Sequence, residues 1–159
     1  MQKGHLLAFS GVGQLASLVL RLAVGSLFFA AAVRKLQGGT ETIHKTVQYF
    51  QTTFENTWLP STLVTIHAYA TPFIEAAIVI WLILGFRLKA AWMFTALFVT
   101  TLAFGMSVAG KFDTAANNYN YVLICCAGLL LSRFDRFCID TLRGKKTEES
   151  LERDAPGEY

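Results

Sequence analysis

The chain has 159 residues, of which 53% are hydrophobic and only 16% are charged, and its formal net charge is +3. A soluble domain of this length usually has about a quarter of its residues charged. Together with a mean hydropathy of +0.43, the composition argues against a soluble protein and indicates one membrane domain. Basic residues lie beside apolar runs rather than along one stripe, which argues against a nucleic-acid partner.

Four apolar stretches approach the length of about 20 residues that a helix needs to cross the hydrocarbon core. The second contains Pro72, which predicts a kink. The fourth is purely apolar only over "YVLICCAGLLL", so its preceding part, "AANNYN", is expected to face other helices or water. The sequence therefore predicts an all-α membrane protein, a bundle of four transmembrane helices with spans at 15–33, 60–85, 90–109 and 115–132.

The connection between the first two spans has a helical pattern of its own. Ile43, Val47, Phe50 and Phe54 recur at the spacing of one helix face. We predict an amphipathic helix over 40–56, which either lies on the membrane surface or packs on the end of the bundle.

Lysine and arginine beside the spans set the expected orientation, because they collect on the cytoplasmic side. The side that carries more of them holds Lys3, Arg87, Lys89, Arg133, Arg136, Arg143, Lys145 and Lys146. We therefore predict a multi-pass protein of a bacterial-type inner (cytoplasmic) membrane, with both termini cytoplasmic. Residues 1–142 then form the membrane domain and residues 143–159 a charged cytoplasmic tail.

Two charged residues fall inside predicted spans, where charges are costly and usually face the bundle interior. If Lys35 marks the outer boundary of the hydrocarbon core, Arg21 lies ~21 Å inward of it along the helix, and if Gly85 marks the inner end of the second span, Glu75 lies ~15 Å above that end. Across a core of ~30 Å the two charged groups then differ in depth by about 6 Å, which an arginine side chain can bridge. We predict a structural ion pair between Arg21 and Glu75, and the same two residues are the candidate catalytic groups.

Other polar residues could line a seam toward this pair. His67, Thr71 and Glu75 step by four along the second span, and Asn120 and Tyr121 lie in the fourth. His67, Asn120 and Tyr121 are candidate cofactor-binding residues, although no cofactor is predicted and the ligand classes considered are a quinone or a lipid. The alternative interpretation is that they only hydrogen-bond or anchor helix ends.

Metal and thiol chemistry have no support in the sequence. The three histidines lack the spacing of a metal site, and the three cysteines form no CxxC pair. We predict no metal site and structural cysteines.

Several segments in order resemble the DoxX-like family of small four-helix membrane proteins. They are "RLAVGSLFFAAAVRKL", "WLPSTLVTIHAYATPFIEAAIVIWLILGFRLKAA", "FGMSVAGKF" and "NNYNYVLICCAGLLLS", which together cover about residues 15–134. The resemblance implies the same four helices and places this chain's residues at recurring family positions: Arg21, Gly25, Lys35, Glu75 and Gly85. It also implies a link to redox systems, since the family takes its name from a membrane subunit of a thiosulfate:quinone oxidoreductase.

The function predicted from these observations is an integral membrane accessory subunit of a larger respiratory or electron-transfer complex, mainly structural rather than catalytic. Its partners would be membrane lipids and other subunits, bound through apolar helix faces and the 143–159 tail. Two alternatives stay open: a quinone-reactive subunit of an oxidoreductase, and a small transporter formed by an oligomer.

Overall fold

A computed structural model describes residues 2–135 and 138, with side chains from residue 11 onward. The described chain is all-helical, as the composition predicts. Its elements are α1 (Gln2–Leu36), α2 (Gly39–Phe54), α3 (Ser61–Leu84), α4 (Leu88–Val108), α5 (Phe112–Leu131) and the 3₁₀ turn η1 (Ser132–Phe134).

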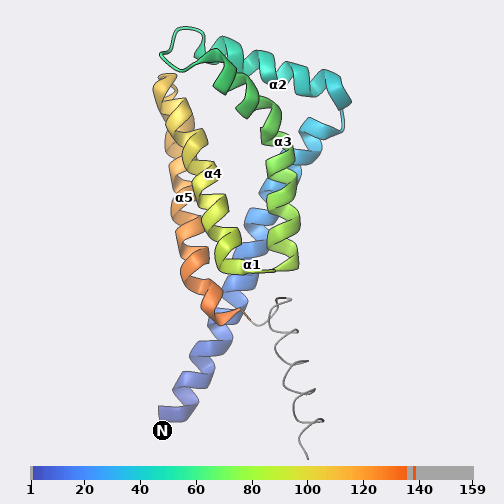
Figure 1. The fold of residues 1–159 in the computed structure, drawn as a ribbon. Helices are drawn as coiled ribbons and strands as arrows, with labels where there is room; N and C mark the ends of the chain where they lie inside the picture. The colour runs from blue at the N-terminus through green and yellow to red at the C-terminus, as the bar shows by residue number, and fades with distance from the viewer. Residues whose placement is uncertain (1, 136–137, 139–159) are drawn as a thin grey trace, which may run out of the picture.

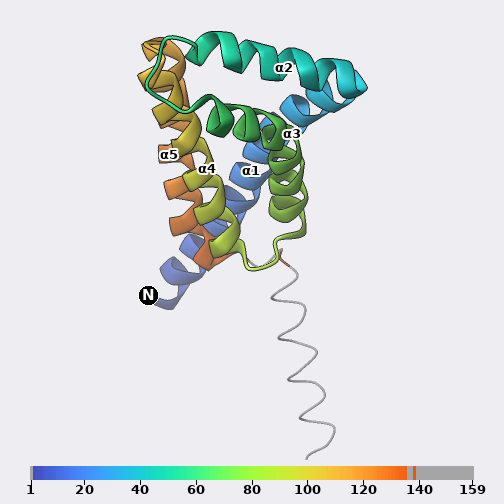
Figure 2. The same cartoon turned by 45° about the horizontal axis from the view of Figure 1, so that its top comes forward.

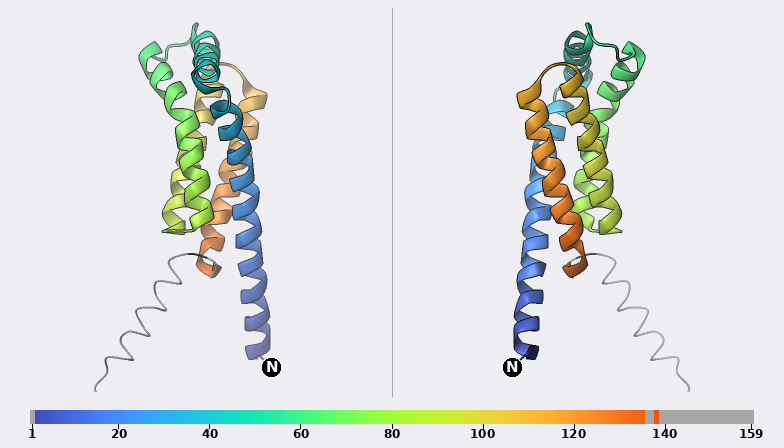
Figure 3. Two further views of the ribbon diagram at one scale, coloured as in Figure 1. Left: turned by 90° about the vertical axis from the view of Figure 1, so that its right-hand side faces the viewer. Right: turned by 90° about the vertical axis from the view of Figure 1, so that its left-hand side faces the viewer.

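The helices form two packed pairs with a fifth helix across one end (Figure 1). Helix α1 packs along α3, and α4 packs along α5, to which the short turn after Val108 connects it. Helix α2 lies across the end of the bundle where α1 finishes and α3 begins, which we call the α2 end. The opposite end, at the turn between α3 and α4, is the Gly85 end. Helix α1 is longer than the others and extends beyond the bundle there (Figure 3).

Three helices are long and apolar enough to cross a membrane: α1 over Gly11–Leu36, α3 and α4. The prediction of an all-α membrane protein is therefore confirmed. Helix α5 occupies the place of the predicted fourth span, and it runs beside α4 over its length (Figure 3). Because the first half of α5 contains "DTAANNYN", its composition alone does not establish a span, and a bundle of exactly four spans stays a prediction.

Local sequence explains the shapes of α2 and α3. One side of α2 packs on the bundle, where Val47 and Phe54 are buried, and most of its other side chains are exposed. Helix α3 contains Pro72 and is bent in its first half (Figure 2). Proline lacks the N–H that would bond one turn back and its ring crowds the carbonyl there, so a bend at this point is expected.

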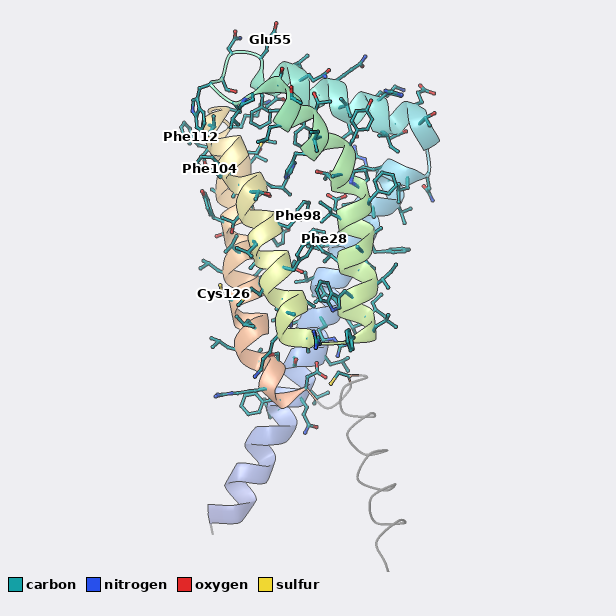
Figure 4. The ribbon with its side chains drawn as sticks, in the orientation of Figure 1. Phe28, Glu55, Phe98, Phe104, Phe112 and Cys126 are labelled. Carbon is teal, nitrogen blue, oxygen red and sulfur yellow. The ribbon has the colours of Figure 1, made fainter. Side chains whose placement is uncertain are left out.

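The core lies between the two helix pairs. Phe28 of α1 and Phe98 of α4 meet there with their ring centroids 6.5 Å apart (Figure 4). Ile78, Leu82 and Trp92 are at most 1% exposed in the same cluster. Apolar side chains of α3 and α4 also point outward, and large ones such as Phe73, Ile80 and Leu97 are exposed.

Gly128 sets the distance between α4 and α5. A Cβ atom at this position would lie 2.4 Å from Cε2 of the Trp92 ring, so the helices can approach this closely only with glycine on α5. We expect Gly128→Ala to lower the free energy of unfolding by about 1–3 kcal/mol, since the core must shift to admit the methyl group.

Thermal unfolding of the purified protein in detergent measures this effect. Gly25→Ala is the matched control, because a Cβ atom there meets nothing within 4 Å and alanine favours the helix. Equal melting temperatures for Gly128→Ala and Gly25→Ala would contradict the proposed contact.

Candidate functional site

The charged side chain of Arg21 is buried at the Gly85 end, where it joins three parts of the chain. Its Nε donates a hydrogen bond to the carbonyl oxygen of Leu82 at 2.9 Å, and Nη2 donates to that of Ile83 at 2.8 Å. Its Nη1 lies 2.9 Å from Oδ2 of Asp135, which also accepts a hydrogen bond from Ser17. We call this arrangement the Arg21 clamp, and it ties α1 to the last turn of α3 and to the chain that leaves η1.

The clamp answers why an arginine lies in an apolar helix. The last carbonyl groups of a helix have no partner within it, and they carry the negative end of the helix dipole. Arg21 supplies both hydrogen bonds and positive charge to that end of α3. Its side chain is 4% exposed and that of Asp135 is 0% exposed, so each charge depends on protein groups rather than on water.

Gly85 leaves the space that the guanidinium group occupies. This residue ends α3 with a φ of 67°, a conformation in which glycine is favoured. A Cβ atom there would also lie 2.8 Å from Nη2 of Arg21 and 2.9 Å from Cβ of Cys138. The same glycine therefore both turns the chain toward α4 and makes room for Arg21.

A second, partly buried ion pair lies nearer the α2 end. Lys35, in the last turn of α1, places its Nζ atom 2.5 Å from Oε1 of Glu75 on α3. The Lys35 side chain is 25% exposed, whereas that of Glu75 is only 6% exposed. Oε2 of Glu75 is buried without a hydrogen-bond partner among the described residues.

The predicted ion pair between Arg21 and Glu75 is therefore wrong, since each residue has a different partner. Arg21 reaches α3 at Leu82 and Ile83, which lie seven and eight residues from Glu75, or ~10–12 Å along the helix. Lys35 has a long flexible stem that reaches Glu75 from the end of α1. The two charges were correctly expected to face the bundle interior, but each is paired at its own depth.

The polar stripe predicted on α3 continues to α4 rather than to α5. The Thr71 hydroxyl donates to the carbonyl oxygen of His67 at 2.8 Å, and it lies 3.4 Å from Nδ1 of the same residue. Nε2 of His67 lies 3.1 Å from Oγ1 of Thr101 on α4. The His67 ring is stacked on Phe98 with a centroid distance of 6.0 Å. His67 therefore connects α3 to α4 through a hydrogen bond and a ring contact.

A largely apolar cavity of about 470 Å³ opens beside His67 at the α2 end. Its walls come from α2, the following loop, α3 and α4, and include Phe50, Phe54, Leu63, His67, Thr101 and Phe104. The volume lies in the usual range of small-molecule sites, which are mostly apolar with a few polar groups. His67, Thr100 and Thr101 are the residues in this wall whose side chains carry hydrogen-bonding groups.

The other two candidate cofactor residues lie elsewhere. Asn120 is exposed on α5, and Tyr121 packs against the hydrophobic core. Neither is among the residues that line the cavity with His67. In the part of the chain that the structure describes, no three histidine, cysteine, aspartate or glutamate side chains are grouped to hold a metal ion.

Asp135, Ser17 and the role of Lys35 were not predicted from the sequence. Asp135 lies between two arginines just beyond the last apolar run, where an aqueous position was the natural expectation. Ser17 precedes Arg21 by one helical turn, and Lys35 follows it on the same face by 14 residues. That shared face was the available signal that Arg21 and Lys35 both point toward α3.

Comparisons with known proteins give one family. Residues 13–117 match the family described as methylamine utilisation protein MauE, and this range is more than half of the chain. It includes Arg21, Lys35 and Glu75, as well as most of the wall of the cavity. No curated protein and no solved structure matches. The three apolar helices and this match lead to one conclusion: the chain is a membrane protein that belongs to the MauE family.

Proposed function

We propose that the protein is an integral membrane accessory subunit of an electron-transfer system, with a mainly structural role. The observation that carries this proposal is the use of its buried charges. Arg21 and Glu75, the two candidates for catalysis, each hold α1 against another part of the chain through Asp135 and Lys35. Groups that act in this way fix helices in place and leave the outer apolar faces to contact lipids and partner subunits.

The family description supports the kind of system that this subunit would serve. The name of the matched family refers to methylamine utilisation, and the use of an amine as a nutrient requires an oxidation that releases electrons. We infer that the partners are membrane subunits of such a system. The 143–159 tail, which is a second proposed contact, lies outside the described residues.

Four spans and cytoplasmic termini belong to the same proposal. Helix α5 is 20 residues long and packs along α4, so it covers the same depth as a helix that can cross the membrane. An even number of spans returns the C-terminal end to the side of the N-terminus, and Arg87, Lys89 and Arg133 lie at that end. We therefore propose four spans in an inner membrane with both termini cytoplasmic. A relationship to the DoxX-like family is part of the same proposal.

Purification from native membranes in a mild detergent tests the accessory role. We expect other membrane subunits to co-purify with the full chain in fixed stoichiometry, and the isolated chain to catalyse no quinone reduction or oxidation. If the protein runs alone and turns over a quinone, the accessory role is wrong.

The cavity beside His67 favours a second candidate function, a quinone-reactive subunit. Its apolar wall fits an isoprenoid tail, and the His67 ring and the Thr101 hydroxyl could hydrogen-bond a quinone carbonyl oxygen. Arg21 and Glu75 line no part of this cavity. In this candidate function they therefore keep their structural role, and His67 is the residue that contacts the ligand.

A short-chain ubiquinone analogue should then raise the melting temperature of the wild-type protein, because a ligand that binds only the folded state stabilises it. We expect His67→Phe to abolish most of this shift, since phenylalanine keeps the ring contact with Phe98 but has no hydrogen-bonding nitrogen. Thr65→Val, two residues away and outside the cavity wall, is the matched control. No shift for the wild-type protein, or equal shifts for both variants, would contradict the quinone site.

A further inference from the structure

Another cavity lies at the Gly85 end, and its wall contains two basic residues. Its volume is about 520 Å³, which is enough for a small ligand or headgroup. The wall comes from the start of α4, from η1 and from the chain that follows η1, and it includes Arg87, Lys89, Ala90, Ser132, Asp135 and Cys138. We call this space the basic cavity.

The basic cavity lies at a boundary of the membrane. Helix α3 ends at Leu84 and α4 begins at Leu88, and each of these helices is long and apolar enough to cross a membrane. The short turn that joins two consecutive spans lies where the hydrocarbon ends. The position of the cavity therefore follows from α3 and α4, and it requires no span in α5.

The charges in and around the wall favour an anion. Arg87 and Lys89 each contribute a cation, and Lys89 forms no ion pair with a described residue. Asp135 contributes a carboxylate, but its Oδ2 atom lies 2.9 Å from both Nη1 of Arg21 and Oγ of Ser17, so its charge is balanced inside the protein. The N-terminus of α4 has no side-chain cap and adds the positive end of the helix dipole.

The turn before α4 holds the two cations in place. Gly85 and Arg87 both have positive φ values, of 67° and 45°, and the indole N–H of Trp81 donates a hydrogen bond to the carbonyl oxygen of Phe86 between them. The guanidinium group of Arg87 lies over the Phe86 ring, 5.8 Å from its centroid. A left-handed conformation is uncommon for arginine and persists only where the surroundings fix it. The turn therefore presents Arg87 and Lys89 from a defined backbone.

An apolar face continues from the basic cavity toward the middle of the membrane. Ala90 lines the cavity, and Phe94 and Leu97 follow it by four and seven residues, which places them on the same face of α4. Both side chains are exposed. A ligand held in the cavity by its headgroup could lay its acyl chains along this face, whereas a soluble anion would use the cations alone.

We propose that the basic cavity binds the headgroup of an anionic phospholipid. The phosphate oxygens accept charge-assisted hydrogen bonds from the side chains of Arg87 and Lys89. The acyl chains extend along the exposed face of Phe94 and Leu97 into the hydrocarbon. This site depends neither on the proposed accessory role nor on the quinone site beside His67.

Native mass spectrometry of the full chain tests the site, with phosphatidylglycerol and phosphatidylcholine of the same acyl chains as probes. We expect the wild-type protein to bind phosphatidylglycerol about 25-fold more tightly, since each basic residue near a headgroup contributes about fivefold. Arg87→Asn and Lys89→Gln should each lower this preference about fivefold, and asparagine tolerates the left-handed conformation. Arg87→Lys keeps the charge and should retain most of the preference. Equal affinity of the wild-type protein for the two lipids would overturn the proposal.

Two further substitutions separate a site from general attraction to a basic surface. Arg133→Gln is the matched control, because Arg133 is exposed at the same end and is not among the residues of the cavity wall. Arg34→Gln removes an exposed cation near the α2 end. Both variants should keep the preference for phosphatidylglycerol, and a loss in Arg133→Gln as large as that in Lys89→Gln would contradict a defined site.

Glycerol 3-phosphate distinguishes the two sources of a phosphate group. It carries the charge of a lipid headgroup without acyl chains, so at millimolar concentration it should not displace phosphatidylglycerol from the wild-type protein. Displacement that is lost in Lys89→Gln would show that the basic cavity binds a soluble phosphate, and the assignment to a lipid would be wrong.

Discussion

Replacing Arg21 with leucine is expected to lower the free energy of unfolding by about 3–5 kcal/mol, the usual cost of breaking a buried ion pair by removing one partner. The cost has a specific source. Asp135 loses its cation, and its side chain, which is 0% exposed, cannot regain water without moving η1 away from α1. The carbonyl groups of Leu82 and Ile83 lose their donors at the same time.

Thermal unfolding in one detergent measures this loss, with an expected decrease in melting temperature of about 6–20 °C for a chain of this size. Arg34→Leu is the matched control, because Arg34 lies on the same helix with its side chain exposed. Arg21→Lys should recover little, since an ammonium group cannot reproduce the fork that contacts Asp135 and two carbonyl groups.

The double variant Arg21→Leu/Asp135→Leu separates the cost of the unpaired carboxylate from the value of the clamp. Because replacing both members of a buried pair with apolar side chains is often nearly neutral, we expect it to be more stable than Arg21→Leu alone. If the loss in free energy of unfolding for the double variant equals the sum of the losses for Arg21→Leu and Asp135→Leu, the two residues do not act as a pair.

Apolar patterning made most of the architecture predictable. Long apolar runs locate helices even when their ends are uncertain, and the spacing of Val47 and Phe54 correctly gave α2 its inward face. Pro72 gave the position of the bend in α3. The extension of α1 before its apolar part was not predicted. No proline interrupts residues 2–14, and the helix continues through Gly4, Gly11 and Gly13.

The pairing of the buried charges was not predictable in the same way. Sequence spacing gives depth along one helix, but the tilt of two helices and the reach of long side chains decide which charges meet. Lys35 was expected to mark a membrane boundary, yet its side chain extends inward to Glu75. Asp135 lies outside every apolar run, and only the folding of η1 against α1 brings it beside Arg21.

The two members of the second ion pair should respond unequally to substitution. Lys35→Met leaves the Glu75 carboxylate 6% exposed with no cation, whereas Glu75→Gln leaves an ammonium group that is already 25% exposed and can extend to water. We therefore expect Lys35→Met to cost several kcal/mol, on the scale of a broken buried pair, and Glu75→Gln to cost about 1 kcal/mol.

Unfolding of the two single variants and of Lys35→Met/Glu75→Gln forms a double-mutant cycle for this pair. The double variant should be close to Glu75→Gln, because the unpaired carboxylate is gone. Lys45→Met and Glu41→Gln are the controls, since their ion pair lies one helical turn apart on α2 with both side chains more than two-thirds exposed, and such pairs contribute little.

The same variants decide between a structural and a catalytic use of Glu75. If the carboxylate only fastens α3 to α1, then Glu75→Gln in the assembled membrane complex should keep its electron-transfer rate while its melting temperature falls. A catalytic carboxylate gives the reverse result, because glutamine keeps the shape and the hydrogen bond to Lys35 but cannot carry a proton or a charge through the reaction. Loss of the rate with an unchanged melting temperature would therefore show that Glu75 is a reactive group and that Lys35 positions it. The mainly structural role proposed for this pair would then be wrong.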